Sequence, residues 1–374
     1  SLSSIPAPRL GAVVINEVRN RVGIPPEEID EVIMGCVLSA GLGQAPARQA
    51  AIFAGLSNDV ECLTINKMCG SGLKAIMLAD QVIKAGDADV VIAGGMENMS
   101  QAPYYLHKAR GGFRLGHGEL TDGMIKDGLW DVYNDVHMGI CAEKCAREYQ
   151  FSREDQDNFA EQSYKRALWA QSEGLFADEI VPVAVPQRKG EPVIIEKDDE
   201  PGRGNFDKMR KLRAAFEKDG TITAANASKI NDGAAACMIM SADKAKELGI
   251  QPIARIVSQA SAAHAPEWFS TAPAKAMNKA VLKADLKMDQ IELFEINEAF
   301  SAVTMAAIQE FDLDPDKVNI NGGAVSLGHP IGASGGRIMA TLLNAMSQKN
   351  VRFGMTSICI GGGEASAVII ESLL

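Results

Sequence analysis

The sequence predicts an α/β fold that contains two copies of one βα unit. Segments with strand-like and helix-like patterns alternate at both ends of the chain, as expected for strands wrapped by helices. Short sequence motifs from the first hundred residues recur in the same order in the last hundred. With 374 residues, the chain is also long enough for two or more packed units.

The first copy begins with elements that can be placed in order. Residues 9–22 carry apolar side chains at helical spacing, and residues 31–38 form an apolar run of strand length. Residues 73–84 are again helical in pattern. Residues 89–93 have the pattern of a buried strand, which two glycines close.

The second copy has strand patterns at residues 292–296 and 355–360. Between the copies, residues 101–230 are rich in glycine and charge and contain one helical stretch, residues 153–171. This region has the character of a long insertion that forms a lid or a binding surface, without a third core of its own.

Three motif pairs support the duplication. They are Ile29–Val32 with Ile291–Phe294 (offset 262), Ser71–Lys74 with Ser334–Arg337 (offset 263), and Gly94–Glu97 with Gly361–Glu364 (offset 267). Coincidence between glycine-rich turns is the alternative. Since ligands bind where strand ends converge in such sheets, we expect the site where the two copies meet.

The charge of the chain limits its partners. A net charge of −11 argues against nucleic-acid binding, and any anionic ligand must therefore meet a local basic patch. The best candidate contains five cations between Arg203 and Arg213, although a solvated helix face would have the same composition. We find no apolar run long enough for a membrane span and no secretory pattern at Ser1, and we expect a cytoplasmic protein.

The seven cysteines are scattered and form no C-x-x-C pair, which argues against a disulfide framework and for a reducing compartment. His137, Cys141 and Cys145 align on a helix but lack a fourth ligand and a zinc spacing. We therefore expect no metal site there, and half-buried thiols instead.

Two residues lie at equivalent strand-to-helix junctions. Cys69, in Asn66-Lys67-Met68-Cys69-Gly70-Ser71-Gly72, would face the positive end of a helix, which favours the thiolate; a buried cysteine in a tight turn is the alternative. His329, in Gly328-His329-Pro330, lies before the helix of the second copy. If the copies are related by a two-fold axis, this histidine can take the proton of Cys69.

Two more candidates follow strands. Cys359 precedes Gly361, and the glycine run can offer backbone N–H groups to an oxyanion. A second thiol at the same site could move a proton on carbon. Asn297 could fix a water or polarise a carbonyl, or it could simply cap a helix.

Together, these four motifs resemble the thiolase family over essentially the whole chain. The resemblance implies a five-layered α/β/α/β/α core, with acyl-CoA thioesters as substrates, coenzyme A as a substrate or product, and no tightly bound cofactor. By this likeness Cys69 is acylated with help from His329, and Cys359 is the acid/base. Asn297 and His329 would form one oxyanion hole, and the N–H groups of Cys69 and Gly361 the other.

The resemblance also implies a domain division and a set of ligand contacts. Residues 1–100 plus 231–250 would form the first half, residues 101–230 a loop domain, and residues 251–374 the second half. Residues 110–118 resemble a segment that joins dimers into a homotetramer. Arg203 in the basic patch would meet the nucleotide end of coenzyme A. The expected pantetheine contacts are His137, Met138, Phe216, Ala224, Ser228, Ile230, Ala299 and Phe300.

Several positions depart from the family pattern. The family has a strand and an Arg-Thr-Pro turn before the position of Ser1, so we expect the first sheet to be one strand short. Phe269–Pro273 replaces a methionine and a Gly-x-Gly-Pro turn, Glu364 replaces a small apolar residue, and Arg203 is offset by two residues. His137–Gly139 resembles the short-chain branch of the family, which implies acetoacetyl-CoA formation from two acetyl-CoA. A longer-chain 3-ketoacyl-CoA thiolase and a non-catalytic acyl-CoA or lipid-binding protein remain as alternatives.

Overall fold

The computed structural model describes residues 1–374 and contains two four-stranded mixed sheets of similar topology. The first sheet has the order β10-β3-β1-β2, with β1 (Glu31–Gly35) parallel to both β2 (Glu61–Ile65) and β3 (Val90–Asn98). Its last strand, β10 (Asp232–Met240), is antiparallel to β3 and enters the sheet only after the long insertion. The second sheet has the order β11-β14-β13-β12. Its strands are β11 (Ala254–Ala263), β12 (Leu293–Ile296), β13 (Phe353–Ile360) and β14 (Glu364–Ser372).

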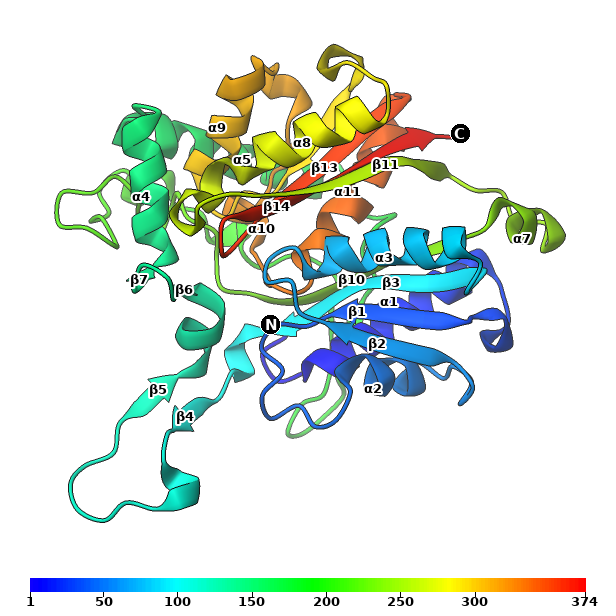
Figure 1. Ribbon diagram of the computed structural model, residues 1–374, viewed down its shortest axis with the longest axis horizontal. Helices are drawn as coiled ribbons and strands as arrows, with labels where there is room; N and C mark the ends of the chain where they lie inside the picture. The colour runs from blue at the N-terminus through cyan, green and yellow to red at the C-terminus, as the bar shows by residue number, and fades with distance from the viewer.

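Helices and sheets stack in five layers, as the resemblance implied (Figure 1). Helices α1 (Ala7–Val22) and α2 (Pro46–Phe53) pack on the outer face of the first sheet. Helices α3 (Ser71–Ala85) and α11 (Ser334–Lys349) form the middle layer between the sheets. Helices α8 (Ala272–Lys283) and α9 (Ser301–Phe311) cover the outer face of the second sheet. None of the helices combines the length and hydropathy that a membrane crossing needs.

Local sequence explains where the elements start and stop. Helices α1 and α3 end at Gly23 and Gly86, whose positive φ angles suit the left-handed residue that closes a helix. Strand β3 is buried over its whole length because helices cover both faces of the sheet, which explains its continuous apolar pattern. The predicted helices and strands are therefore present, with ends shifted by a few residues.

The duplication is visible in the middle layer. Helices α3 and α11 begin at Ser71 and Ser334, the residues that the second motif match had paired. Glycines bring the two helices into backbone contact: a side chain on Gly72 would meet the amide of Gly336, and one on Gly335 would meet that of Leu73. The N-terminal ends of the two helices are thus packed directly against each other.

The third motif match, between Gly94–Glu97 and Gly361–Glu364, does not pair equivalent positions of the two copies. Gly94 and Gly95 lie inside β3, whereas Gly361–Gly363 form the turn between β13 and β14. Strand register identifies the true counterparts: Met34 pairs with Gly94 in the first sheet, as Ile296 pairs with Ser357 in the second. The structural offset therefore stays near 263, and the extra four residues reflected a chance likeness between glycine runs.

The insertion covers one end of the two sheets and extends an arm away from the body (Figure 1). The arm carries β4 (Tyr104–Leu106) paired with β5 (Leu120–Asp122). The rest of the insertion contains β6 (Trp130–Asp131), β7 (Val136–His137), α4 (Met138–Glu148), α5 (Arg153–Ser172), β8 (Val183–Val185), β9 (Val193–Ile195) and α6 (Phe206–Met209). Two short helices, α7 (Ala242–Glu247) and α10 (Ala324–Leu327), lie outside it.

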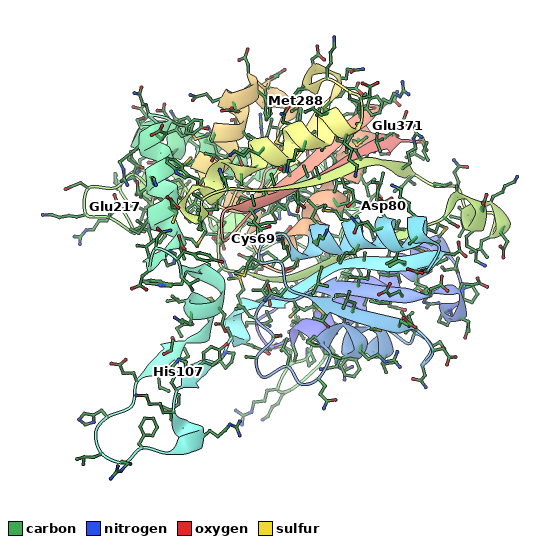
Figure 2. The ribbon with its side chains drawn as sticks, viewed as in Figure 1. Cys69, Asp80, His107, Glu217, Met288 and Glu371 are labelled. Atoms are coloured by element: carbon green, nitrogen blue, oxygen red, sulfur yellow. The ribbon has the colours of Figure 1, made fainter.

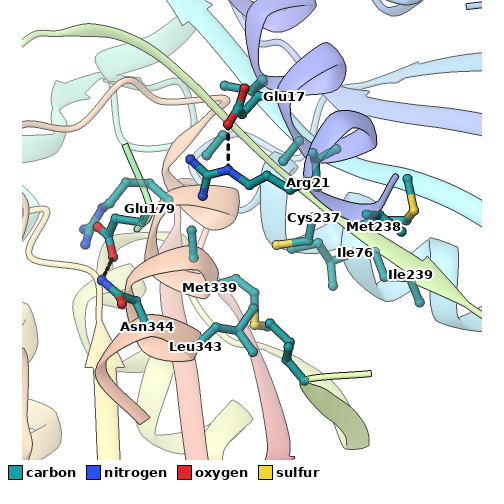
Figure 3. Close-up of a pocket in the computed structure, with 18 of the residues that line it drawn as sticks. Glu17, Arg21, Ile76, Glu179, Cys237, Met238, Ile239, Met339, Leu343 and Asn344 are labelled. Atoms are coloured by element: carbon teal, nitrogen blue, oxygen red, sulfur yellow. Dashed lines mark hydrogen bonds and ion pairs between the residues drawn. The ribbon is translucent and has the colours of Figure 1, made fainter. Parts of the chain in front are cut away.

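The two sheets differ at one edge. Strand β14 is paired on both sides, by β13 and β11, whereas β10 is paired only with β3. The open side of β10 borders a cavity of about 1400 Å³ lined by α1, α3, α11 and residues 176–198. Figure 3 shows this lining, with Glu179 directed at Asn344 and Arg21 at Glu17.

Candidate functional site

Cys69 lies in the turn between β2 and α3, at the end of the sheets that faces the insertion (Figure 2). The turn is tight, with Met68 in the left-handed region at φ 48°. The Ser71 hydroxyl accepts from the Lys67 N–H (2.8 Å) and donates to the Met68 carbonyl (2.6 Å). Gly70 packs so closely against Ile360 that a Cβ at this position would displace the Ile360 side chain. The Cys69 turn is therefore fixed against the end of β13, next to Cys359.

The resting form of Cys69 is the thiol. Burial raises its pKa to about 11, although the backbone N–H groups of Gly361 and Cys69 itself face the sulfur and act in the opposite direction. These N–H groups favour the thiolate, as expected at a helix N-terminus, but the loss of hydration has the larger effect on the pKa of Cys69. A base is needed before this sulfur can attack, and two N–H donors already converge on it.

Cys359 is fully buried near the end of β13. Burial, and next the charge of Cys69, raise the pKa of Cys359 well above its usual value. The two cysteines therefore interact, although they are 290 residues apart in the sequence. Met138, Phe269 and Phe300 pack in the same apolar cluster as Cys359.

His329 is buried in the turn that precedes α11, and Ser334 orients its ring. Nδ1 of His329 lies 2.6 Å from the Ser334 hydroxyl, which also donates to the Pro330 carbonyl at 3.0 Å. A hydroxyl has one proton, so both contacts are satisfied when Nδ1–H donates to Ser334. Nε2 then carries a free lone pair, and no protein group bonds to it. Burial lowers the pKa of His329 to about 4, which keeps the ring neutral.

Glu97 joins the two halves beneath this site and was missed in the sequence. Its buried carboxylate accepts from the N–H groups of Val37 (2.9 Å), Leu38 (3.1 Å) and Gly332 (2.9 Å). The first two donors follow β1 and the third belongs to the His329 turn. A carboxylate within an otherwise apolar strand was the available signal, because a buried acid needs several donors.

Asn297 follows β12 and is buried, with both atoms of its amide unbonded. Its backbone N–H donates to the Ser357 carbonyl (2.9 Å), which fixes it beside β13. The amide does not cap α9, so the simple structural alternative does not hold. Since buried polar groups are nearly always paired, unbonded atoms on Asn297 and His329 point to a place where a polar ligand binds.

The expected pantetheine contacts form a connected surface beside Cys359. The His137 ring stacks on Phe216 with centroids 4.7 Å apart, and Phe216 meets the edge of Phe300 at 6.0 Å. Met138 lies next to Gly361. The Ser228 N–H donates to the Ala299 carbonyl (3.0 Å), which joins the insertion to the turn after β12. Ala224 and Ile230 lie exposed on the same segment as Ser228.

The basic patch is less free than the sequence suggested. Arg203 is exposed and pairs with Asp199 (3.6 Å) and Glu200 (3.3 Å), and Arg210 pairs with Glu161 (2.7 Å). Lys208, Lys211 and Arg213 are exposed and make no ion pair within the chain. Three of the five predicted cations thus remain available to an anion.

The other cysteines have ordinary surroundings. All seven are free of disulfides, and Cys141 contacts Asp131 (3.6 Å) while Cys145 contacts the Ala302 carbonyl (3.9 Å). No group of three or more His, Cys, Asp and Glu side chains has an arrangement that could hold a metal ion. The large cavity beside β10 contains none of Cys69, His329 and Cys359, so the site lies elsewhere.

Comparison with known proteins identifies the family. Residues 1–243 match the model described as "Thiolase, N-terminal domain", and residues 250–372 match "Thiolase, C-terminal domain". The chain is 54% identical to the acetyl-CoA acetyltransferase of Cupriavidus necator, covering 99% of this chain and 95% of that protein. It is 52% identical to acetyl-CoA acetyltransferase 2 of Arabidopsis thaliana, covering 100% and 93%.

Solved structures agree with this. The acetyl-CoA acetyltransferase of Bacillus anthracis has a TM-score of 0.97 at 41% identity, covering 100% of this chain and 94% of that one. A thiolase of Ascaris suum in complex with coenzyme A has a TM-score of 0.95 at 45% identity, covering 100% and 95%. The chain therefore belongs to the thiolase family.

Proposed function

We propose that the protein is an acetyl-CoA C-acetyltransferase that interconverts two acetyl-CoA with acetoacetyl-CoA and coenzyme A. The observation that carries the proposal is the packing of the Cys69 turn against the end of β13, which contains Cys359, at a point where the N–H groups of Gly361 and Cys69 face the Cys69 sulfur. The names of the relatives, at about half identity over nearly the whole chain, support the same activity.

Cleavage of acetoacetyl-CoA would begin at Cys69. Nε2 of His329 takes the thiol proton, and the thiolate attacks the 3-keto carbon. The oxygen on this carbon becomes negatively charged and accepts hydrogen bonds from the N–H groups of Cys69 and Gly361. The carbon–carbon bond breaks and leaves an acetyl group on Cys69 and the enolate of acetyl-CoA. The thiol of coenzyme A then gives its proton to Cys359, which has lost its own to the enolate, and attacks the acetyl group, while Cys69 leaves and takes back the proton that His329 held.

Cys359 would supply the proton for the enolate. A thiol whose pKa is raised holds its proton until a strong base forms beside it, and the enolate is such a base. The enolate oxygen would meet His329 and, through a water, Asn297, whose amide has no protein partner. In condensation the same groups act in reverse, and Cys359 takes a proton from the methyl group of acetyl-CoA.

Phe269 favours a short acyl chain. Its ring is buried and meets the edge of Phe300 (6.2 Å) in the cluster that contains Cys359. This phenyl ring takes space that a longer chain would need, which favours acetoacetyl-CoA over longer 3-ketoacyl-CoA.

The remaining assignments belong to the same proposal. The domains are residues 1–100 plus 231–250, 101–230 and 251–374, and the second of these holds coenzyme A, with Arg203 and its neighbours near the nucleotide. The arm exposes apolar side chains that suit a homotetramer, among them Tyr104, Leu106, Leu115 and Leu120. The free cysteines suit the cytoplasm.

The test separates acylation from carbon–carbon chemistry. We expect Cys69→Ala to lose covalent labelling by radioactive acetyl-CoA. Cys359→Ala should still be labelled but should neither condense acetyl-CoA nor cleave acetoacetyl-CoA. Cys62→Ala, another half-buried cysteine, is the matched control and should behave as the parent. Normal condensation by Cys359→Ala would refute the mechanism, and a preference above four carbons in a chain-length series would refute the substrate.

A further inference from the structure

Lys229 has an unusual set of partners. Its ammonium donates to the carbonyls of Ala224 (2.6 Å) and Ala227 (2.8 Å), and the Ala225 carbonyl lies at 3.5 Å. No carboxylate lies within ion-pair distance of it. The Tyr164 ring adds a cation–π contact at 5.6 Å. One half-buried cation therefore serves a group of main-chain oxygens and has no counter-ion in contact.

These carbonyls need a cation. The segment from Ala224 to Ala227 is a turn that ends in one isolated bridge to Phe300, and no backbone N–H donates to the carbonyls of Ala224, Ala225 and Ala227. Carbonyl dipoles that point at one spot repel one another, and an ammonium with three N–H groups relieves this repulsion. Burial lowers the pKa of Lys229 to about 8, so the side chain is still mainly charged at pH 7.

The same segment is joined to the candidate site at both ends. The Asn226 carbonyl accepts from the Ser301 N–H (2.9 Å), and the Ser228 N–H donates to the Ala299 carbonyl (3.0 Å). The Lys229 carbonyl accepts from the N–H of His329 (3.0 Å). The side chain of Lys229 thus sets the shape of the turn, while its main chain holds the turn against His329.

We propose that Lys229 is a positioning residue whose tethered ammonium holds the 224–228 turn in the shape that receives the pantetheine arm of coenzyme A. The inference rests on the proposed function, because Ala224 and Ser228 are pantetheine contacts only there. Removing the ammonium should loosen the turn and weaken coenzyme A binding. The chemical steps should suffer less, because the main-chain bond from His329 remains in any side-chain variant.

The experiment compares two variants of Lys229 in the thiolysis of acetoacetyl-CoA. Lys229→Met keeps an apolar stem without the charge, and Lys229→Ala leaves room for a small added cation. We expect the KM for coenzyme A to rise about tenfold in both, which is the loss of roughly one to two hydrogen bonds, and kcat to fall less than threefold. Lys246→Met, an exposed lysine on α7, is the matched control and should keep the parent KM.

Chemical rescue distinguishes a missing cation from general damage. Ammonium or methylammonium chloride should lower the KM of Lys229→Ala toward that of the parent. Tetramethylammonium chloride at the same ionic strength should not, because it has no N–H groups and is too large. A KM within twofold of the parent would overturn the inference, as would a loss that all three salts restore equally or that none restores.

The proposed function and this inference can fail separately. If the parent enzyme does not cleave acetoacetyl-CoA, the proposed function fails. Calorimetric titration with coenzyme A then tests the inference directly, with weaker binding by Lys229→Ala and its recovery in ammonium as the expected result. If the parent cleaves acetoacetyl-CoA and Lys229→Met binds coenzyme A normally, only the inference fails. Lys229→Arg, which retains the charge, provides a second folded variant and should lose less affinity than Lys229→Met.

Discussion

The two turns that precede α3 and α11 share one structural feature, a serine at the start of the helix, but this serine has a different role in each turn. In the first copy, Ser71 begins α3 and bonds only to backbone, from Lys67 to Met68. In the second copy, the equivalent Ser334 begins α11 and bonds to the Pro330 backbone and to the ring of His329. The same hydroxyl shapes the nucleophile's turn in one copy and orients the base in the other.

This difference shows how a duplicated fold can build an asymmetric site. The two-fold relation brings the equivalent turns of the two copies together. A residue that differs between the copies therefore lies beside the turn of the other copy, and two different side chains meet at one site. Here a thiol and an imidazole occupy related turns. Backbone contact between α3 and α11 fixes the distance between the turns before any side chain contributes.

The largest expected effect on activity is that of His329→Ala, which removes the base from the turn of the second copy. Without a base, the Cys69 thiol, with its pKa of about 11, should ionise too little at neutral pH, and kcat/KM should fall about 10²–10⁴-fold. The rate of acetyl transfer to Cys69 in a rapid-quench experiment measures this. The parent should also lack an acid limb near pH 6.5, since a His329 pKa of about 4 leaves the base unprotonated throughout pH 5–7. A variant that acylates as fast as the parent would remove His329 from the mechanism.

A sharper comparison uses the two serines. Ser334→Ala should lower kcat/KM about tenfold, because one hydrogen bond that fixes the imidazole is lost, and Ser334→Thr should recover most of it. Ser71→Ala should instead lower the unfolding free energy by about 1–2 kcal/mol, since it strands the Lys67 N–H. Urea unfolding and steady-state kinetics on both variants check this. The opposite pattern, with turnover lost at Ser71 and stability lost at Ser334, would contradict the division of roles.

The smallest expected effect concerns an ion pair between the copies. Lys67 precedes Cys69, and its ammonium pairs with Glu364 at the start of β14, with both side chains about one-third exposed. Solvent screens such pairs, so Lys67→Met and Glu364→Gln should each cost less than about 1 kcal/mol of stability. A double-mutant cycle from urea unfolding measures the coupling, which should shrink further in 1 M salt. A coupling above 2 kcal/mol would mean that the pair holds the halves together.

Much of the fold was predictable because its signals are local. Continuous apolar runs marked β3 and β13, helical spacing marked α1, α3 and α5, and the serine at the start of α3 and α11 identified the repeat. The meeting of Cys69 and Cys359 was predicted from motifs at the strand ends, and the structure places the Cys69 turn against Ile360, the residue that follows Cys359. The catalytic roles stay predictions until the variants are measured.

What escaped prediction depends on contacts that are remote in sequence. Glu97 receives donors from Val37 and from Gly332, which lies 235 residues away, and no spacing rule connects them. The protonation state of Cys69 depends on how much protein surrounds the sulfur, which a motif does not contain. The hydrogen bonds of the Lys229 ammonium go to its own segment, but its contact with the Tyr164 ring and the bond from the His329 N–H to its carbonyl join residues that are remote in sequence.

The glycine contact between α3 and α11 has a consequence for how this enzyme can be altered. Because backbone meets backbone at Gly72 and Gly335, a side chain at either position would push α3 and α11 apart. A design that joins halves from different relatives would therefore have to preserve both glycines and the close approach of the two helices. Sequence identity in the outer helices would matter far less to such a chimera.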